Sequence, residues 1–205
     1  MNFTAFAFAL ILIIIIAIHK PIRASAHCDT MDGPTVKDGM KALETGNINH
    51  AYKWTDPAYE AELKELFDKC RKVRAMGPDA QEVADRVFLE NLVRIHRAGE
   101  GEGFTGIKPH GVPMDEKVAA ADKSIETGSL APMIGLFSQN EMHVLEEKFH
   151  TAMALKNFDL DDVSAARRFI AAYVSFFKLA EGEEHAHGRH AVHAADTHHR
   201  EHGGH

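Results

Sequence analysis

The stretch "DPAYEAELKELFDKCRKVRAMGPDAQEVADRVFLENLVRIHRAG", residues 56–99, decides the fold, because it contains two helical patterns with a sharp break between them. Asp56 and Pro57 suit a helix start, since an Asp side chain caps free backbone N–H groups and proline is tolerated in the first turn. The Gly77–Pro78 pair ends this helix, and the next helix is expected from about residue 79 to residue 98. The short break predicts an antiparallel pair of helices.

Apolar side chains recur at helical spacing in both segments, which predicts that each helix buries one face. In the first segment these residues are Tyr59, Leu63, Leu66, Phe67, Cys70 and Val73. In the second segment they are Val83, Val87, Phe88, Leu92 and Ile95. Gly99 suits the end of the second helix. Residues 99–113 hold five glycines, so we expect a connector or a lid there rather than a regular element.

Helical signals continue on both sides of this pair. Further helices are expected over residues 36–45, 114–127, 131–156 with a break near Gly135, and 159–181. No segment shows the sustained alternation of apolar and polar residues that is typical of a strand. The sequence therefore predicts an all-α protein, an antiparallel helical bundle of four long helices plus one or two short ones.

The N-terminal segment, residues 1–26, differs from this central part. An apolar run without charges, residues 3–18, is followed by Ala24-Ser25-Ala26. A short apolar core followed by a small-x-small site is typical of a secretory signal peptide. We therefore expect cleavage after Ala26 and export to the periplasm or the extracellular space. An uncleaved N-terminal anchor is the alternative, and the helical bundle domain is expected over residues 27–182.

The C-terminal segment, residues 183–205, holds eight of the fifteen histidines and almost no large apolar side chain. Such a composition cannot form a core, so we expect a tail that is disordered without a ligand. The histidine pairs His185/His187 and His198/His199 are candidate ligands for Ni(II), Cu(II) or Zn(II). A solubilising tail that responds to pH is the alternative interpretation.

The net charge argues against nucleic acid as a partner. The whole chain has 23 Lys and Arg against 30 Asp and Glu, and loss of Lys20 and Arg23 with the signal peptide makes the charge of the mature chain more negative still. Binding to phosphates needs a basic face, which this balance does not favour. The two cysteines, Cys28 and Cys70, are compatible with one disulfide in an oxidising compartment or with two free thiols.

Cleavage after Ala26 makes His27 the first residue of the mature protein, followed by Cys28. A free α-amine has a pKa of about 7.7–8.0, so a metal can displace its proton near neutral pH. The amine and the imidazole of His27 close a chelate ring, and the thiolate and amide nitrogen of Cys28 add donors that suit Ni(II) or Cu(II), with Zn(II) as the alternative ion. Asp32 supplies a nearby carboxylate. The alternative interpretation is that His27 is only the residue that cleavage leaves first.

The start His27-Cys28-Asp29, leading into a helical bundle, is similar to the mature start of nickel superoxide dismutase. This resemblance implies that the terminal amine, the ring of His27, and the thiolate and amide of Cys28 are candidate nickel ligands. The dismutase family has another cysteine at the sixth mature position, where this chain has Asp32. The resemblance implies a redox enzyme acting on superoxide as an alternative function.

A second resemblance covers most of residues 1–180. The segments "HCDTMDGPTV", "KALETGNIN" and "FLENLVRIHRAGEGEGFTGIKP" resemble a family of exported bacterial proteins that is catalogued only as a domain of unknown function. This resemblance implies an exported helical domain and supplies no activity.

The segment "NEMHVLEEKFH" places His143, Glu147 and His150 on one face of a helix, because their spacing is four and three residues. Glu147-x-x-His150 is one half of the motif that di-metal helical bundles use twice. These three residues are therefore candidate metal ligands, and a solvated polar helix face is the alternative.

His96 lies at the end of a predicted helix and at the mouth of the glycine-rich segment. A histidine at this place suits the negative end of the helix dipole, and a catalytic or anion-binding role is the alternative.

The leading hypothesis is an exported metal-binding protein that holds nickel or copper at its mature start and collects metal with its tail. The alternatives are a redox enzyme similar to nickel superoxide dismutase and a non-enzymatic envelope module without an essential metal. The expected partners are metal ions, with no nucleic acid and no stable membrane span after cleavage. The sequence is compatible with a homo-oligomer and leaves enzymatic activity open.

Overall fold

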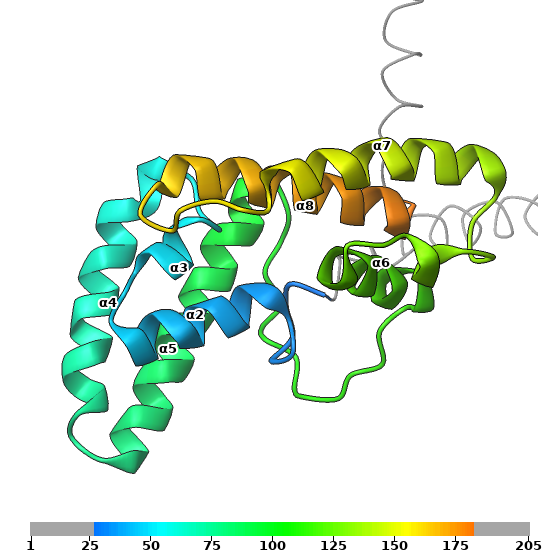
Figure 1. The fold of residues 1–205 in the computed structure, drawn as a ribbon. Helices are drawn as coiled ribbons and strands as arrows, with labels where there is room; N and C mark the ends of the chain where they lie inside the picture. The colour runs from blue at the N-terminus through cyan, green and yellow to red at the C-terminus, as the bar shows by residue number, and fades with distance from the viewer. Residues whose placement is uncertain (1–26, 183–205) are drawn as a thin grey trace, which may run out of the picture.

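The computed structural model describes residues 27–182 (Figure 1), so the predicted signal peptide and the His-rich tail lie outside the described residues. The described part is all-α, as predicted. The α-helices are α2 (Pro34–Thr45), α3 (Asn49–Tyr52), α4 (Glu60–Arg74), α5 (Pro78–Gly99), α6 (Glu116–Thr127), α7 (Gln139–Leu155) and α8 (Val163–Glu181). Two 3-10 turns, η1 (Pro57–Tyr59) and η2 (Ala131–Met133), precede α4 and α7. No helix among residues 27–182 is long and apolar enough to cross a membrane.

Helices α4 and α5 form the antiparallel pair that the opening stretch predicts. The Asp56 side chain accepts a hydrogen bond from Ala58 N and caps η1, and Pro57 occupies its first position. Gly77 has φ of 133°, a backbone conformation that favours glycine, and this allows the tight turn into Pro78. The two helices pack through Phe67 and Phe88, whose ring centroids lie 5.4 Å apart.

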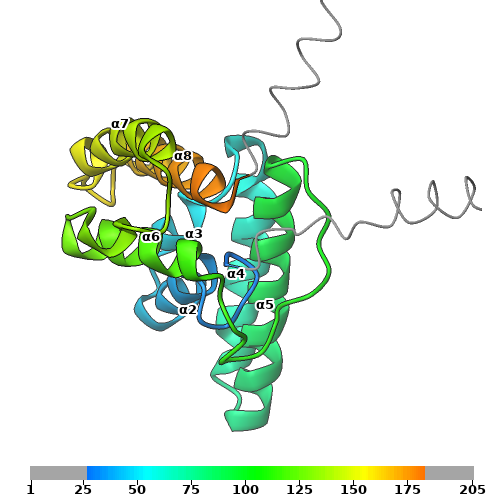
Figure 2. The ribbon, with the colours of Figure 1, turned by 90° about the vertical axis from the view of Figure 1, so that its right-hand side faces the viewer.

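The other long pair, α7 and α8, lies across the α4–α5 pair, as both ribbon views show (Figures 1 and 2). Helix α7 begins with a capping box, in which Ser138 and Glu141 satisfy each other's backbone N–H groups. Asp162 caps α8 by accepting from Ala165 N. Phe149 of α7 and Phe176 of α8 join the pair, with their ring centroids 5.9 Å apart.

The shorter helices fill the angle between the two pairs. Helix α2 packs closely on α5 because Gly39 has no side chain, and a Cβ there would lie 2.7 Å from Leu89 Cδ2 and 2.8 Å from Leu92 Cδ2. Helix α6 packs on α8 and contacts η2. The predicted segment 131–156 consists of η2 followed by α7, and Gly135, with φ of 87°, lies in the break.

Candidate functional site

The first described residues, 27–30, are buried in the protein. His27 is 3% exposed and Asp29 is fully buried, and Cys28 and Thr30 are also buried. Gly33 makes this packing possible, because a Cβ at that position would overlap the His27 carbonyl group. The segment that the sequence predicts as a mature start is therefore packed into the core.

The glycine-rich segment holds this start in place through residue 108. Lys108 N donates to the Asp29 carbonyl at 2.7 Å, and Met31 N donates to the Lys108 carbonyl at 3.0 Å. These two bonds flank an isolated parallel bridge between Thr30 and Lys108. The predicted connector thus adds a short β-like contact, which sequence periodicity could not indicate.

Asp32, a predicted metal ligand, binds the same segment. Its carboxylate accepts from His110 Nδ1 at 2.7 Å and from Gly111 N at 2.8 Å. The Gly111 N–H and His110 hold the pKa of Asp32 below its ordinary value. Both carboxylate oxygens therefore have partners in the loop.

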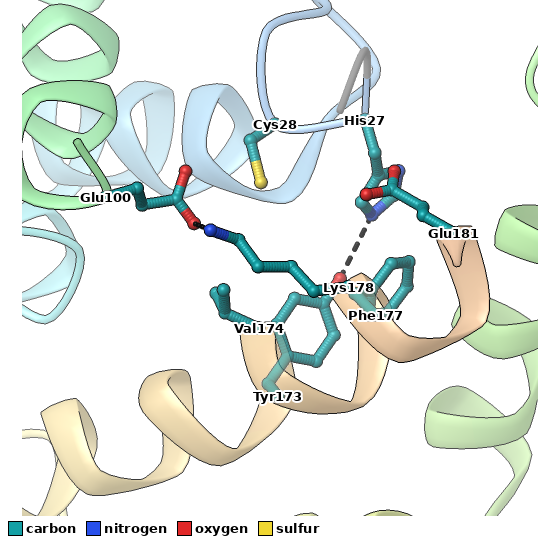
Figure 3. Close-up of a pocket in the computed structure, with 8 residues that line it drawn as sticks. All are labelled: His27, Cys28, Glu100, Tyr173, Val174, Phe177, Lys178 and Glu181. Atoms are coloured by element: carbon teal, nitrogen blue, oxygen red, sulfur yellow. Dashed lines mark hydrogen bonds and ion pairs between the residues drawn. The ribbon is translucent and has the colours of Figure 1, made fainter. Parts of the chain in front are cut away.

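His27 is oriented by residues of α8, which Figure 3 shows, and by Asp122 of α6. Its ring stacks on Phe177 of α8, with 4.6 Å between centroids and an interplanar angle of 5°. Its Nε2 lies 3.0 Å from Tyr173 Oη and 3.4 Å from Asp122 Oδ2 of α6. Tyr173 donates its own hydroxyl proton to Asp122 Oδ1 at 3.0 Å.

The hydrogen bonds define which ring nitrogen of His27 carries the proton. Burial opposes the charge on Asp122, but the bonds from His27 and Tyr173 outweigh it and hold the pKa of Asp122 below its ordinary value, so this carboxylate accepts. Because the Tyr173 proton goes to Asp122, the Tyr173 oxygen accepts from His27 Nε2. The neutral form of the ring therefore has its proton on Nε2 and a lone pair on Nδ1. Nδ1 is buried and has no hydrogen-bond partner within residues 27–182.

Cys28 lies beside His27 and lines the same small cavity, of about 10 Å³, with Tyr173 and Lys178. Figure 3 shows Lys178 passing below the Cys28 sulfur toward Glu100. Burial, reinforced by the nearby Glu100 carboxylate, raises the pKa of the Cys28 thiol far above its ordinary value. Cys28 and Cys70 are both free and buried, so they are not joined to each other.

A buried arginine lies behind this cavity. Arg97, which is 1% exposed, places Nη1 3.1 Å from Glu100 and Nε 3.7 Å from Asp29, and Glu102 lies 3.8 Å from Nη2. Burial raises the pKa of Asp29, and the charge of Arg97 opposes this effect. Arg97 thus compensates several carboxylates, those of Asp29 among the first described residues and of Glu100 and Glu102 after the end of α5.

His96, the neighbour of Arg97, lies in the last turn of α5, as predicted, and is also buried. Its Nδ1 donates to the Trp54 carbonyl at 3.0 Å, and the Trp54 ring meets its ring edge-on at 5.3 Å. Burial lowers the pKa of His96. A favourable contact with the helix dipole is therefore not the main determinant of this position.

The other predicted metal ligands lie apart from the buried residues around His27, Cys28 and Arg97. His143, Glu147 and His150 all lie on the exposed face of α7, and His150 faces Glu146 at 3.7 Å. In the described part of the chain, no three His, Cys, Asp or Glu side chains form a group that could hold a metal ion. The tail histidines His185, His187, His198 and His199 lie outside the described residues.

Several of the buried residues around His27 and Cys28 were not predicted from the sequence to belong to a site. Tyr173 lies in the helix predicted over residues 159–181 without being a candidate site residue, and Asp122, Arg97 and Glu100 belong to no motif. One signal was present for Tyr173: a hydroxyl in an otherwise apolar run, "AAYVSFF", needs a partner once it is buried. Nothing in the sequence indicates that Asp122 is that partner, since the two residues lie on different helices.

The structure defines an all-α protein in which the first described residues, 27–30, are buried against polar side chains of α5, α6 and α8. The chain belongs to a family of unknown function, DUF6448, which matches residues 32–179. No curated protein and no solved structure matches the chain. The match confirms the resemblance to a family without an assigned function, and it assigns no chemistry to the site.

Proposed function

We propose that this chain is an exported metal-binding protein, with a Ni(II) or Cu(II) site at the mature start formed by His27 and Cys28. The observation that carries the proposal is the state of His27: Nε2 is held by Tyr173 and Asp122, while the buried Nδ1 has a lone pair and no partner among the described residues. A buried acceptor without a partner is costly, so this atom is available to bind a ligand.

A chain cleaved after Ala26 has further donor atoms next to Nδ1 of His27. After cleavage the His27 nitrogen becomes an α-amine, and the amine and Nδ1 close a six-membered chelate ring around one ion. The amide nitrogen and thiolate of Cys28 extend the donor set, which then contains the nitrogen and sulfur donors that Ni(II) and Cu(II) prefer. Two of these four donors are backbone nitrogens, so the proposed site uses only two side chains, those of His27 and Cys28. The buried Cys28 thiol must lose its proton on binding.

The contacts of Nε2 support the same role. A histidine that binds a metal through one nitrogen commonly donates the proton of its other nitrogen to a carboxylate or carbonyl, which fixes the orientation of the ring. Asp122 and Tyr173 do this for His27, and the stacking on Phe177 fixes the ring plane. The predicted tail, rich in histidine, supplies metal in this proposal.

The deciding experiment is metal analysis of protein secreted with its native start and of a version with one extra alanine before His27. Both versions end at residue 182, because the tail histidines bind metal themselves and the described helices are then complete. We expect stoichiometric nickel or copper in the native version and a large loss in the extended one, because an extra residue removes the amine chelate. Equal metal content in the two versions overturns the proposal. Superoxide turnover of the loaded protein then separates binding from redox catalysis.

A second prediction concerns Tyr173→Phe, which keeps the ring and removes the hydroxyl that accepts from His27. Loss of a contact that orients a metal ligand typically lowers metal affinity by about 10- to 100-fold. We expect a fall of this size in a competition titration with a chelator of known affinity. Tyr52→Phe is the matched control, because its hydroxyl only bonds the Glu60 carbonyl. An unchanged affinity for Tyr173→Phe contradicts the role assigned to His27.

A further inference from the structure

A second and larger cavity lies on the other side of the Glu100–Lys178 ion pair. It is an open groove of about 510 Å³ between the segment around Trp54, the end of α5 and one face of α8. This volume falls within the range of small-molecule sites. The apolar side chains of Ile170 and Val174 form part of its wall.

The strongest indication that this groove can bind a ligand comes from His96. Its side chain lines the groove and is 4% exposed, and Nδ1 donates its proton to the Trp54 carbonyl. Nε2 therefore carries a lone pair when the ring is neutral, which burial favours. Nε2 has no hydrogen-bond partner in the part of the chain that the structure describes, and its nearest charged neighbour is Glu100 at 3.7 Å. The groove thus has a buried acceptor, His96 Nε2, that can accept a hydrogen bond from a ligand.

Lys178 places a cation next to this acceptor. Its Nζ lies 3.5 Å from Glu100 Oε1, beyond the length of a normal hydrogen bond, and its side chain is 27% exposed. The same carboxylate is already bound by Arg97 Nη1 at 3.1 Å. Lys178 is therefore held loosely and can face an anion in the groove. Because His96 Nε2 and Lys178 Nζ both lie within 4 Å of the Glu100 carboxylate, one small molecule can reach both.

The remaining charges of the groove are paired more tightly. Arg167 donates to Glu60 at 2.6 Å, and Lys53 donates to Asp38 at 2.9 Å. The Asp56 carboxylate caps η1. These pairs leave Lys178 as the cation of the groove that can most readily bind an incoming carboxylate.

We propose that this groove binds a small carboxylate that carries a neighbouring hydrogen-bond donor, such as an α-hydroxy acid or an α-amino acid. The carboxylate pairs with Lys178, the hydroxyl or ammonium donates to His96 Nε2, and the carbon chain packs on Ile170 and Val174. This site needs no metal and is separate from the proposed function of the mature start.

Trp54 makes the proposal directly testable, because it is the only tryptophan of the chain and its carbonyl binds His96. The probes are malate, aspartate and succinate, added to the whole protein in the presence of a chelator that removes metal. We expect a saturable change in tryptophan fluorescence with malate or aspartate, and about tenfold weaker binding of succinate, which lacks the donor.

Two variants and one control complete the test. Lys178→Met should weaken binding of every probe by about tenfold, because it removes the cation. His96→Phe, which keeps a planar ring without an acceptor, should abolish the preference of malate over succinate, and the Lys178→Met result keeps the test decisive where His96→Phe fails to fold. Lys123→Met, an exposed lysine on α6, should change nothing. Absence of a saturable signal with both malate and aspartate, or equal affinity for succinate, overturns the proposal. Because metal is removed, these outcomes are independent of the metal content measured for the mature start.

Discussion

Replacing Arg97 by methionine should lower the free energy of unfolding by about 3–5 kcal/mol, because it leaves the buried Asp29 carboxylate without its nearest cation. Asp29 is fully buried, and neither of its carboxylate oxygens has a hydrogen-bond partner within residues 27–182, so Arg97 at 3.7 Å is the main compensation for its charge. Methionine fills a similar volume, so a cavity does not explain the loss. Urea unfolding followed by circular dichroism measures it.

Arg94→Met is the matched control for this prediction. Arg94 lies one turn earlier on α5, its side chain is 43% exposed, and its partner Glu62 is 55% exposed. A solvated pair of this kind contributes at most about 1 kcal/mol, so the control should unfold close to the wild type. Similar losses for Arg97→Met and Arg94→Met would contradict the compensating role of Arg97.

The second large effect is expected for Phe88→Ala, which should cost about 3–5 kcal/mol of the free energy of unfolding. Phe88 is fully buried and packs on Phe67, so truncation removes the main aromatic contact between α4 and α5 and leaves a cavity. The same unfolding experiment measures the loss.

Val87→Ala controls for the change of helix propensity at the neighbouring position. Val87 is 41% exposed, so its truncation removes little buried surface and should change stability by less than about 1 kcal/mol. If Phe88→Ala were as mild as Val87→Ala, the packing of the α4–α5 pair would not be the main source of stability in this region.

Much of the helical fold could be predicted because its signals are local. The Gly77–Pro78 break, the apolar spacing of residues 79–98 and the glycines after Gly99 all act within a few residues, and α5 (Pro78–Gly99) follows them closely. Helix α3 was not predicted, because its four residues are too short to show a period. The crossing of the two long pairs is set by packing between distant helices, which spacing along the chain does not reveal.

Less of the site could be predicted, for the same reason. His27 and Cys28 stood out by residue type, but their burial depends on Gly33 and on bonds to Lys108. His96 was expected at the end of a helix, where it lies, but nothing in the sequence of α5 shows that the segment around Trp54 covers it. The lone tryptophan in a short polar segment was the available signal, since so large an apolar side chain is usually buried somewhere.

The contact between His27 and Tyr173 joins residues 146 positions apart. During synthesis a chain grows from its N-terminus, so the residues around His27 emerge long before α8 exists. They cannot reach their final place until nearly the whole chain has been made, and closing so long a loop is a slow event in folding. The segment around His27 is therefore synthesised early, but its contact with Tyr173 can form only after α8 has been made.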